Sequence, residues 1–144
     1  MSRKTEYGLR AMVALAQMAG VERPVPLREV SENEAIPEQF LDQIMVKLRR
    51  AGLVTSVRGA GGGYRLSRRA EEISIGSIVR VLEGSLSPIN CITEGEGDSP
   101  ENICDLYQGC HTRSVWLRVT IALTEALDKL TLAEVMHDEV PLRV

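Results

Sequence analysis

The spacing of apolar positions over the first fifty residues is that of amphipathic helices. Residues 5–19 carry apolar side chains at i, i+3, i+4 and i+7, which predicts a first helix that Gly20 ends. A short second helix is expected from Val25 to about Glu34, followed by a two-residue turn. Pro37 suits the first position of a third helix, because a proline there loses no hydrogen bond. The side chains expected to face the core are Leu9, Met12, Val13, Ala16, Leu27, Val30, Phe40, Leu41, Ile44, Met45 and Leu48.

After Gly52 the pattern changes to the alternation of a β-strand. Leu53–Val57 alternates, a run of glycines follows, and Tyr64–Ser67 forms a second short strand, which predicts a β-hairpin. The order of short helix, turn, helix and hairpin is that of a winged helix-turn-helix. We therefore predict a mainly α fold with a small β-hairpin, in which residues 1–70 form a DNA-binding domain.

The rest of the chain, residues 71–144, is predicted to be a helical dimerisation region with a polar loop at 85–112. Helices are expected at about 74–83 and about 113–130. The longer helix has an apolar stripe that a small winged helix cannot cover alone, so a second copy, or the first helix, would bury it. We expect the first helix to pack in the dimer as well. The stripe comprises Val115, Trp116, Val119, Ala122, Leu123, Ala126 and Leu130. The expected N-caps are Thr112 for this helix and Thr131 for a short final one.

The composition fits a compact protein built on aliphatic side chains. Of 144 residues, 44% are hydrophobic and only 3% aromatic, and this hydrophobic share is too high for a disordered protein. No apolar run approaches the length of a membrane span, and the charged segment Met1–Glu6 is unlike a secretory signal. We therefore expect a cytoplasmic protein without membrane contact. Thiols stay reduced in that compartment, so clustered cysteines are expected to bind metal or do redox chemistry.

Charge is distributed unevenly along the chain. Residues 1–70 contain twelve Lys and Arg against seven Asp and Glu, whereas residues 71–144 contain five against thirteen. A basic first half can approach the phosphates of DNA while an acidic second half stays away from them. Ordinary surface charge is the alternative interpretation of this asymmetry.

The polar face of the predicted third helix carries side chains suited to reading DNA. Gln39 and Gln43 can hydrogen-bond adenine, and Asp42 can accept from the amino group of cytosine. Lys47 and Arg50 can contact phosphates. For this helix alone, a solvated face is an equally good interpretation.

The predicted hairpin favours the DNA interpretation. Glycines let a backbone approach a surface closely, so the loop could follow the phosphates or put Arg58 into a minor groove. The glycine run lacks the Lys-Ser/Thr ending of a nucleotide-binding P-loop. A plain flexible turn is the alternative. The hairpin residues expected to contact double-stranded DNA are Arg58, Gly61, Gly62, Gly63 and Tyr64.

All the cysteines of the chain, Cys91, Cys104 and Cys110, lie in one acidic segment. Clustered thiolates are soft ligands for iron or zinc, and their union with a DNA-binding domain suggests a metal centre that controls DNA binding. No Cys-x2-Cys occurs, so the spacings match no zinc ribbon. An iron–sulfur cluster usually takes four protein ligands, so a fourth would come from elsewhere. Unrelated free thiols and a structural zinc are alternatives. Catalysis is not expected, because His111 adjoins Cys110 and sequence neighbours seldom form a nucleophile–base pair.

Several segments resemble the winged-helix regulators that include the IscR, NsrR and CymR proteins. They are Lys4–Ala11, Phe40–Gln43, Leu48–Val54 and Ser56–Tyr64. The Arg-Gly-x-Gly-Gly-Gly-Tyr wing is the most specific, and the resemblance continues through Val135. It implies a homodimeric transcription repressor, not an enzyme, with the third helix in the major groove and the wing in the minor groove. The residues that it places at the DNA are Gln39, Asp42, Gln43 and Arg58, and Lys4 is expected beside them.

The resemblance also implies an iron–sulfur cluster, as 2Fe–2S or 4Fe–4S, on the three cysteines. IscR-like proteins use a histidine three residues after the last cysteine, where this chain has Arg113. NsrR-like proteins take a carboxylate from the first helix of the partner subunit, and Glu6 matches that position. We therefore expect Glu6 of the partner subunit as the fourth ligand, with His111 as the alternative. A Glu6 that is merely exposed, or paired with Arg10, would have no such role.

Two kinds of control stay open at this point. In the first, the cluster sets the DNA affinity or sequence choice of a repressor of cluster-assembly, iron, sulfur or stress genes. In the second, a CymR-like repressor of cysteine and sulfur metabolism is controlled by a partner, a metabolic enzyme, and binds no cluster. The segment Arg80–Pro88 resembles CymR more than IscR, which supports the second.

Overall fold

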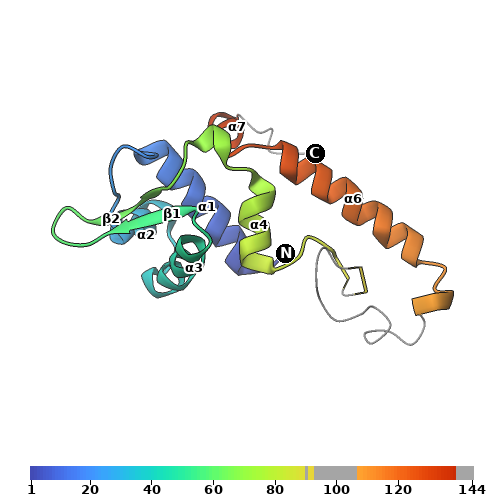
Figure 1. The fold of residues 1–144 in the computed structure, drawn as a ribbon. Helices are drawn as coiled ribbons and strands as arrows, with labels where there is room; N and C mark the ends of the chain where they lie inside the picture. Colours follow the sequence, from blue (N-terminus) through green and yellow to red (C-terminus); the bar gives the residue numbers. More distant parts are fainter. Residues whose placement is uncertain (90, 93–106, 139–144) are drawn as a thin grey trace.

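The computed structural model describes residues 1–89, 91–92 and 107–138, and in these it contains six α-helices and one β-hairpin (Figure 1). The elements are α1 (Arg3–Met18), α2 (Leu27–Glu34), α3 (Glu38–Arg50), β1 (Val54–Val57), β2 (Gly63–Leu66), η1 (Ala70–Glu72), α4 (Ile75–Glu83), η2 (Tyr107–Gly109), α6 (Arg113–Lys129) and α7 (Leu132–His137). This order confirms the predicted mainly α fold with a small hairpin, and each predicted element is found within a few residues of its expected bounds.

The core of the N-terminal part is aliphatic and surrounds α1. This helix packs against α2, α3, α4 and α7, as its central place in Figure 1 shows. Nearly all the predicted core side chains are buried or partly buried. Phe40 is the exception, since 52% of its surface is exposed. The buried stripe of α3 is Leu41, Ile44, Met45 and Leu48, and Phe40 lies at the edge of this stripe, where it reaches solvent. The prediction that Phe40 faces the core is therefore wrong.

The turn between α2 and α3 is fixed by side chains from both sides. Ala35 ends α2 in the left-handed conformation, with φ of 51°. The Ser31 hydroxyl donates to the carbonyl of Ile36 at 2.6 Å, and Ile36 is fully buried. The Arg10 guanidinium donates to the Glu34 carboxylate at 3.2 Å and to the Glu34 carbonyl. Pro37 is the N-cap of α3, one residue before the first helical position that was predicted for it.

The hairpin is anchored to the body of the protein along its second strand. β1 and β2 are antiparallel, with Val54 opposite Leu66 and Val57 opposite Gly63. Val25 and Tyr64 then exchange two backbone hydrogen bonds of 2.7 and 2.8 Å, so Val25, two residues before α2, pairs with the second strand. This approach explains Gly63, whose φ is +147° and where a Cβ atom would lie 2.1 Å from the Val25 carbonyl oxygen.

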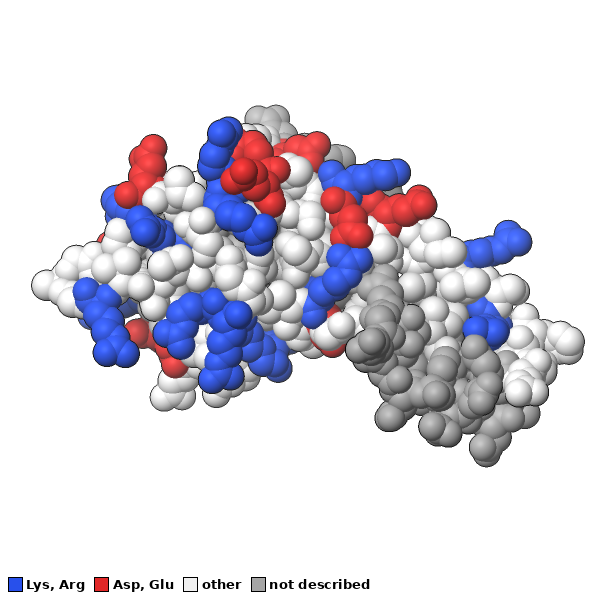
Figure 2. Space-filling view, in the orientation of Figure 1, with Lys and Arg blue, Asp and Glu red and all other residues white. Residues whose placement is uncertain are grey.

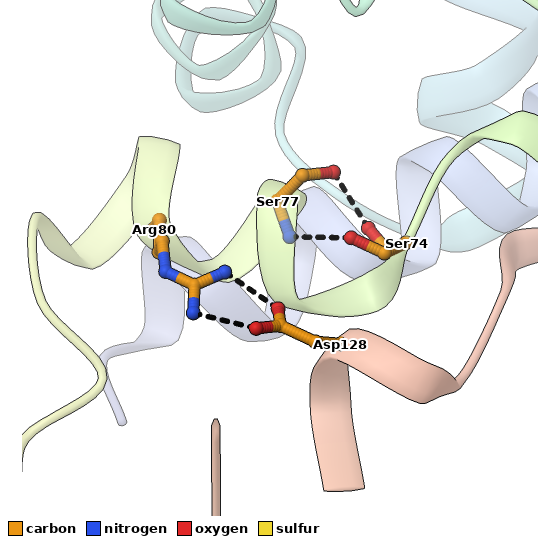
Figure 3. A network of polar contacts seen from close by, with 4 residues as sticks. All are labelled: Ser74, Ser77, Arg80 and Asp128. Carbon is orange, nitrogen blue, oxygen red and sulfur yellow. Dashed lines mark hydrogen bonds and ion pairs between the residues drawn. The ribbon is translucent and has the colours of Figure 1, made fainter. Parts of the chain in front are cut away.

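α6 projects from the body and is held mainly through α4 (Figure 1). The Arg80 guanidinium donates two hydrogen bonds, of 2.5 and 2.9 Å, to the Asp128 carboxylate near the end of α6 (Figure 3). In the same view the Ser74 hydroxyl accepts from the Ser77 backbone at the start of α4. Within the described chain, α6 therefore packs mainly against α4, and not against the first helix, which was one of the two predicted partners. The exposed apolar side chains of α6 are Val115, Leu117, Val119 and Ile121.

The two predicted N-caps of the C-terminal half have different outcomes. Thr131 accepts from the Glu134 backbone and the Glu134 carboxylate accepts from the Thr131 backbone, which is a complete capping box before α7. Thr112 occupies the N-cap position of α6, but its side chain makes no capping hydrogen bond. Its hydroxyl oxygen instead lies 3.3 Å from the sulfur of Cys110.

Candidate DNA-binding surface and cysteine region

The outer face of α3 presents the side chains predicted to contact DNA. The exposed ones are Gln39, Asp42, Gln43, Lys47 and Arg50. They stay accessible because the buried stripe of α3 packs on α1 and α4 and turns the opposite face outward. Lys4, half-buried on α1, lies beside Lys47, and contact with its ammonium group lowers the pKa of Lys47. Two cations held together in this way favour an anion such as phosphate.

The wing offers one arginine and an open backbone. Arg58 is exposed at the end of β1, and a Cβ atom at Gly61 would meet no atom within 4 Å. Gly61 is therefore free to approach a ligand. A Cβ atom at Gly62 would lie 2.2 Å from the Val57 carbonyl, so the turn itself requires this glycine. Tyr64 is half-buried in the sheet, where its backbone is paired with Val25. The fold therefore requires glycine at positions 62 and 63, whether or not these residues contact DNA.

Basic side chains gather over α3 and the hairpin on the face drawn in Figure 2, whereas acidic ones are more frequent toward α4 and α7. Arg49 connects α3 and the hairpin, since its guanidinium lies 3.5 Å from the Ser56 hydroxyl on β1. The helix and the wing therefore present their charge as one surface, which is the arrangement that a polyanion requires.

An aromatic cluster between α1 and α3 was not foreseen from the sequence. The rings of Tyr7 and Phe40 meet edge to face, with centroids 6.3 Å apart and planes at 86°. The guanidinium carbons of Arg3 and Arg10 each lie 5.9 Å from the centroid of the Tyr7 ring. A groove adjoins this cluster, and its lining residues are Leu27, Pro37, Glu38, Gln39, Phe40 and Asp42. The sequence carries no clear signal for this cluster, because Phe40 lies beside the apolar stripe of α3 and fits the same helical pattern.

The N-terminal turn of α1 carries Glu6 and is fastened to the end of α4. Glu6 is exposed, and Arg10, its predicted alternative partner, pairs instead with Glu34. The Glu83 carboxylate accepts hydrogen bonds from the hydroxyl of Thr5 and, at 2.5 Å, from the backbone N–H of Ser2. These hydrogen bonds lower the pKa of Glu83 to about 2, and the bond from Thr5 has the largest effect.

The two cysteines that the structure describes are free and partly exposed thiols at either end of the predicted loop. Cys91 follows α4 and Cys110 precedes α6. The Thr112 hydroxyl, with the backbone N–H groups of Thr112 and Arg113, lowers the pKa of the Cys110 thiol. Such a thiol ionises readily, and thiolate is the form that binds metal. Cys104 lies outside the described residues. His111, the alternative ligand, is exposed beside Cys110.

No three His, Cys, Asp or Glu side chains converge as metal ligands within the part of the chain that the structure describes. The predicted ligand set includes Cys104 and a residue of a second chain, so the geometry of one chain's described residues does not test it. The donor chemistry of Cys91 and Cys110 does fit a soft metal centre, because both are free cysteines and are partly exposed.

Comparison with known proteins identifies the family to which this chain belongs. The family model Rrf2, described as an iron-dependent transcriptional regulator, matches residues 1–138. This chain belongs to the Rrf2 family. Rrf2 proteins are transcriptional regulators and not enzymes, so the predicted class of the protein, a repressor of transcription, agrees with the family. Among the described residues, no helix is both long and apolar enough to cross a membrane.

Relatives within the Rrf2 family carry both of the names that the sequence suggested. The chain is 38% identical to the transcriptional regulator IscR of Vibrio cholerae, covering 98% of this chain and 77% of the relative. It is also 38% identical to the regulator CymR of Bacillus subtilis, covering 92% and 86%. The structure of the Bacillus subtilis CymR, titled the global cysteine regulator, matches with a TM-score of 0.74 over 94% of this chain and 95% of that one. IscR from T. potens matches at 35% identity with a TM-score of 0.71, covering 100% and 90%.

Proposed function

We propose that this Rrf2 protein is a homodimeric DNA-binding repressor whose operator binding is set by an iron–sulfur cluster. The ligands would be Cys91, Cys104, Cys110 and Glu6 of the partner subunit. The observation that carries the proposal is the position of the two described thiols. Cys91 and Cys110 lie on either side of one segment, and Cys110 lies just before α6, the helix with exposed apolar side chains.

The N-terminal turn of α1 carries residues for both functions in this proposal, DNA binding and cluster binding. At its N-terminal turn, Lys4 lies beside Lys47 of α3, and Glu6 is exposed two residues later. A cluster bound there would supply redox-sensitive and exchangeable iron next to this turn. Glu83 holds the same turn to α4, whose end leads into the segment that contains Cys91. In this proposal, a change in what Glu6 binds would therefore affect α1, which also presents Lys4, a lysine expected to bind phosphate.

The dimer in this proposal forms along α6. Its exposed Val115, Val119 and Ile121 would be covered by the same helix of a second copy, because a two-fold pair buries equivalent surfaces. Dimerisation would bring one subunit's Glu6 toward the other's cysteines, and it would set the spacing of the two α3 helices for a palindromic site.

The experiment that tests the cluster uses the full chain purified without oxygen. Iron, acid-labile sulfide and visible absorbance are measured for the wild type, for Cys110→Ala and for Glu6→Ala, with Glu22→Ala as the matched control. We expect a brown wild-type protein, loss of colour in Cys110→Ala and a cluster that decays faster in Glu6→Ala. Glu22→Ala should behave as the wild type, because Glu22 is exposed in the turn after α1 and is not among the predicted ligands. A colourless and iron-free wild type, even after reconstitution, would reject the proposal.

A second candidate is favoured by the likeness to CymR in both sequence and structure. In it the cysteines are incidental, and a metabolic enzyme of cysteine or sulfur metabolism controls DNA binding. Replacement of all three cysteines by alanine separates the two candidates. Regulation of the target gene in cells that is unchanged by this triple replacement would support partner control, and its loss would support the cluster.

A further inference from the structure

We propose that the exposed ring of Phe40 determines part of the operator sequence by packing on the C5-methyl group of a thymine in the major groove. The inference builds on the DNA-binding role of the Rrf2 family and is independent of the cluster. It makes Phe40 a specificity-determining residue that acts beside the polar side chains of α3.

The position of Phe40 is that of a base-reading residue. It is the third residue of α3, and the N-terminal residues of a recognition helix are the ones that reach base edges. Half of its surface faces solvent, although neighbouring Leu41 is fully buried. Of the exposed large apolar side chains in the described residues, Phe40 is the only aromatic one, and four of the others belong to α6.

The ring of Phe40 is held in place before any ligand arrives. Tyr7 presents its ring to Phe40 edge to face, and Tyr7 is itself flanked by the guanidinium groups of Arg3 and Arg10. Arg10 is fixed in turn by its bonds to Glu34. A ring held in this way loses little freedom on binding, so its contact with a ligand is not offset by an ordering cost.

The groove next to Phe40 has the chemistry of a base edge and not of a phosphate. Leu27 and Pro37 supply apolar lining, whereas Glu38 and Asp42 supply carboxylates that repel phosphate. Carboxylates accept hydrogen bonds from the amino groups of cytosine or adenine, and thymine is the one base that presents a methyl group in the major groove. The groove therefore fits a thymine methyl on Phe40, with an amino-bearing base beside it at Asp42 or Glu38.

The test removes the methyl group from the DNA and the ring from the protein. Full-length protein first selects tight-binding sites from duplexes with a randomised centre. Each thymine of the selected site is then replaced by deoxyuridine, which lacks only the methyl group. We expect one such replacement in each half-site to weaken wild-type binding about three- to fivefold, the effect of one methyl group removed from an apolar contact. In Phe40→Ala the same replacement should change affinity less than about twofold.

Two variants separate base reading from a merely structural role. Phe40→Leu keeps an apolar contact and should keep part of the methyl effect. Val21→Ala, which trims another exposed apolar side chain after α1, should keep all of it. The inference is overturned if wild-type binding is insensitive to deoxyuridine at every position. It is also overturned if Phe40→Ala weakens binding but keeps the full methyl effect, because Phe40 would then only support α3.

Discussion

Arg58 is the residue that tests the wing most directly. It is exposed where β1 enters the glycine turn, and basic side chains gather over α3 and the hairpin (Figure 2). Arg58→Ala should weaken operator binding about tenfold and reduce the slope of log K against log salt by about 1, because one phosphate or groove contact is lost. Lys129→Ala, at the end of α6, should leave both quantities unchanged. Fluorescence anisotropy over a salt series measures both, and an unaltered affinity of Arg58→Ala would contradict the wing contact.

Ala35 adopts a backbone conformation that suits glycine better. Its φ of 51° is left-handed, which costs a residue with a Cβ atom on the order of 1 kcal/mol, and glycine avoids this cost. Glycine also gives the unfolded chain more freedom, which offsets part of the gain. Ala35→Gly should therefore raise the free energy of unfolding by about 0.5 kcal/mol in urea titrations. A loss of stability would mean that the alanine methyl group contributes packing that its exposure does not indicate.

Glu83 connects two elements, the first turn of α1 and the last turn of α4, and this connection depends on pH. Its pKa falls from 4.5 to about 2 because Thr5 and Ser2 donate hydrogen bonds to the carboxylate. A lowered pKa in the folded state contributes stability that is present above the unfolded pKa and is lost as pH falls from about 4.5 to about 2.

Glu83→Gln should accordingly be less stable than the wild type at pH 7, by about 2 kcal/mol, the contribution of hydrogen bonds to a charged acceptor. The difference should shrink as pH falls toward the pKa of about 2 and vanish below it, where both chains carry a neutral group at this position. Urea midpoints at several pH values check this expectation. A difference that is independent of pH would show that lost packing, not charge, is the cause.

Arg80 of α4 and Asp128 of α6 form an ion pair between the two helices. The geometry is bidentate, and the Arg80 guanidinium lowers the pKa of Asp128. Both side chains are more than a third exposed, so solvent weakens the attraction between their charges. A double-mutant cycle with Arg80→Ala and Asp128→Ala should give a coupling of about 0.5–1 kcal/mol. A coupling near zero would mean that this ion pair does not stabilise the packing of α6 on α4.

Across the whole molecule, the sequence predicted the elements well because each one has a local signal. The period of 3.6 identified α1, α3, α4 and α6, and Thr131 with Glu134 forms the cap that its sequence indicated. The packing partner of α6 was harder to predict, since nothing in the apolar stripe says which helix it meets. Arg80 and Asp128 are 48 residues apart, and only the fold brings them together.

The DNA contacts of the predicted surface stay a prediction, and the structure shows how far its side chains are exposed and why some of its residues are needed by the fold. The polar face of α3 is exposed as expected, but Phe40 was assigned to the core because apolar residues at the edge of a stripe have no distinct signature. Gly62 and Gly63 are explained by the close approach of Val57 and Val25, which are contacts between segments. The cysteine ligand set stays a prediction, because Cys104 lies outside the described residues and Glu6 would act in a second chain.

One measurement tests the central claim that cofactor and DNA binding are coupled through two chains. A single anaerobic preparation is divided, the cluster is removed from one half with a chelator, and both halves bind the same selected duplex at one salt concentration. We predict that operator affinity differs at least tenfold between the halves, while Glu6→Ala without cluster binds as the cluster-free wild type does. Equal affinity of the two halves, with iron and sulfide verified in only one, would contradict the account.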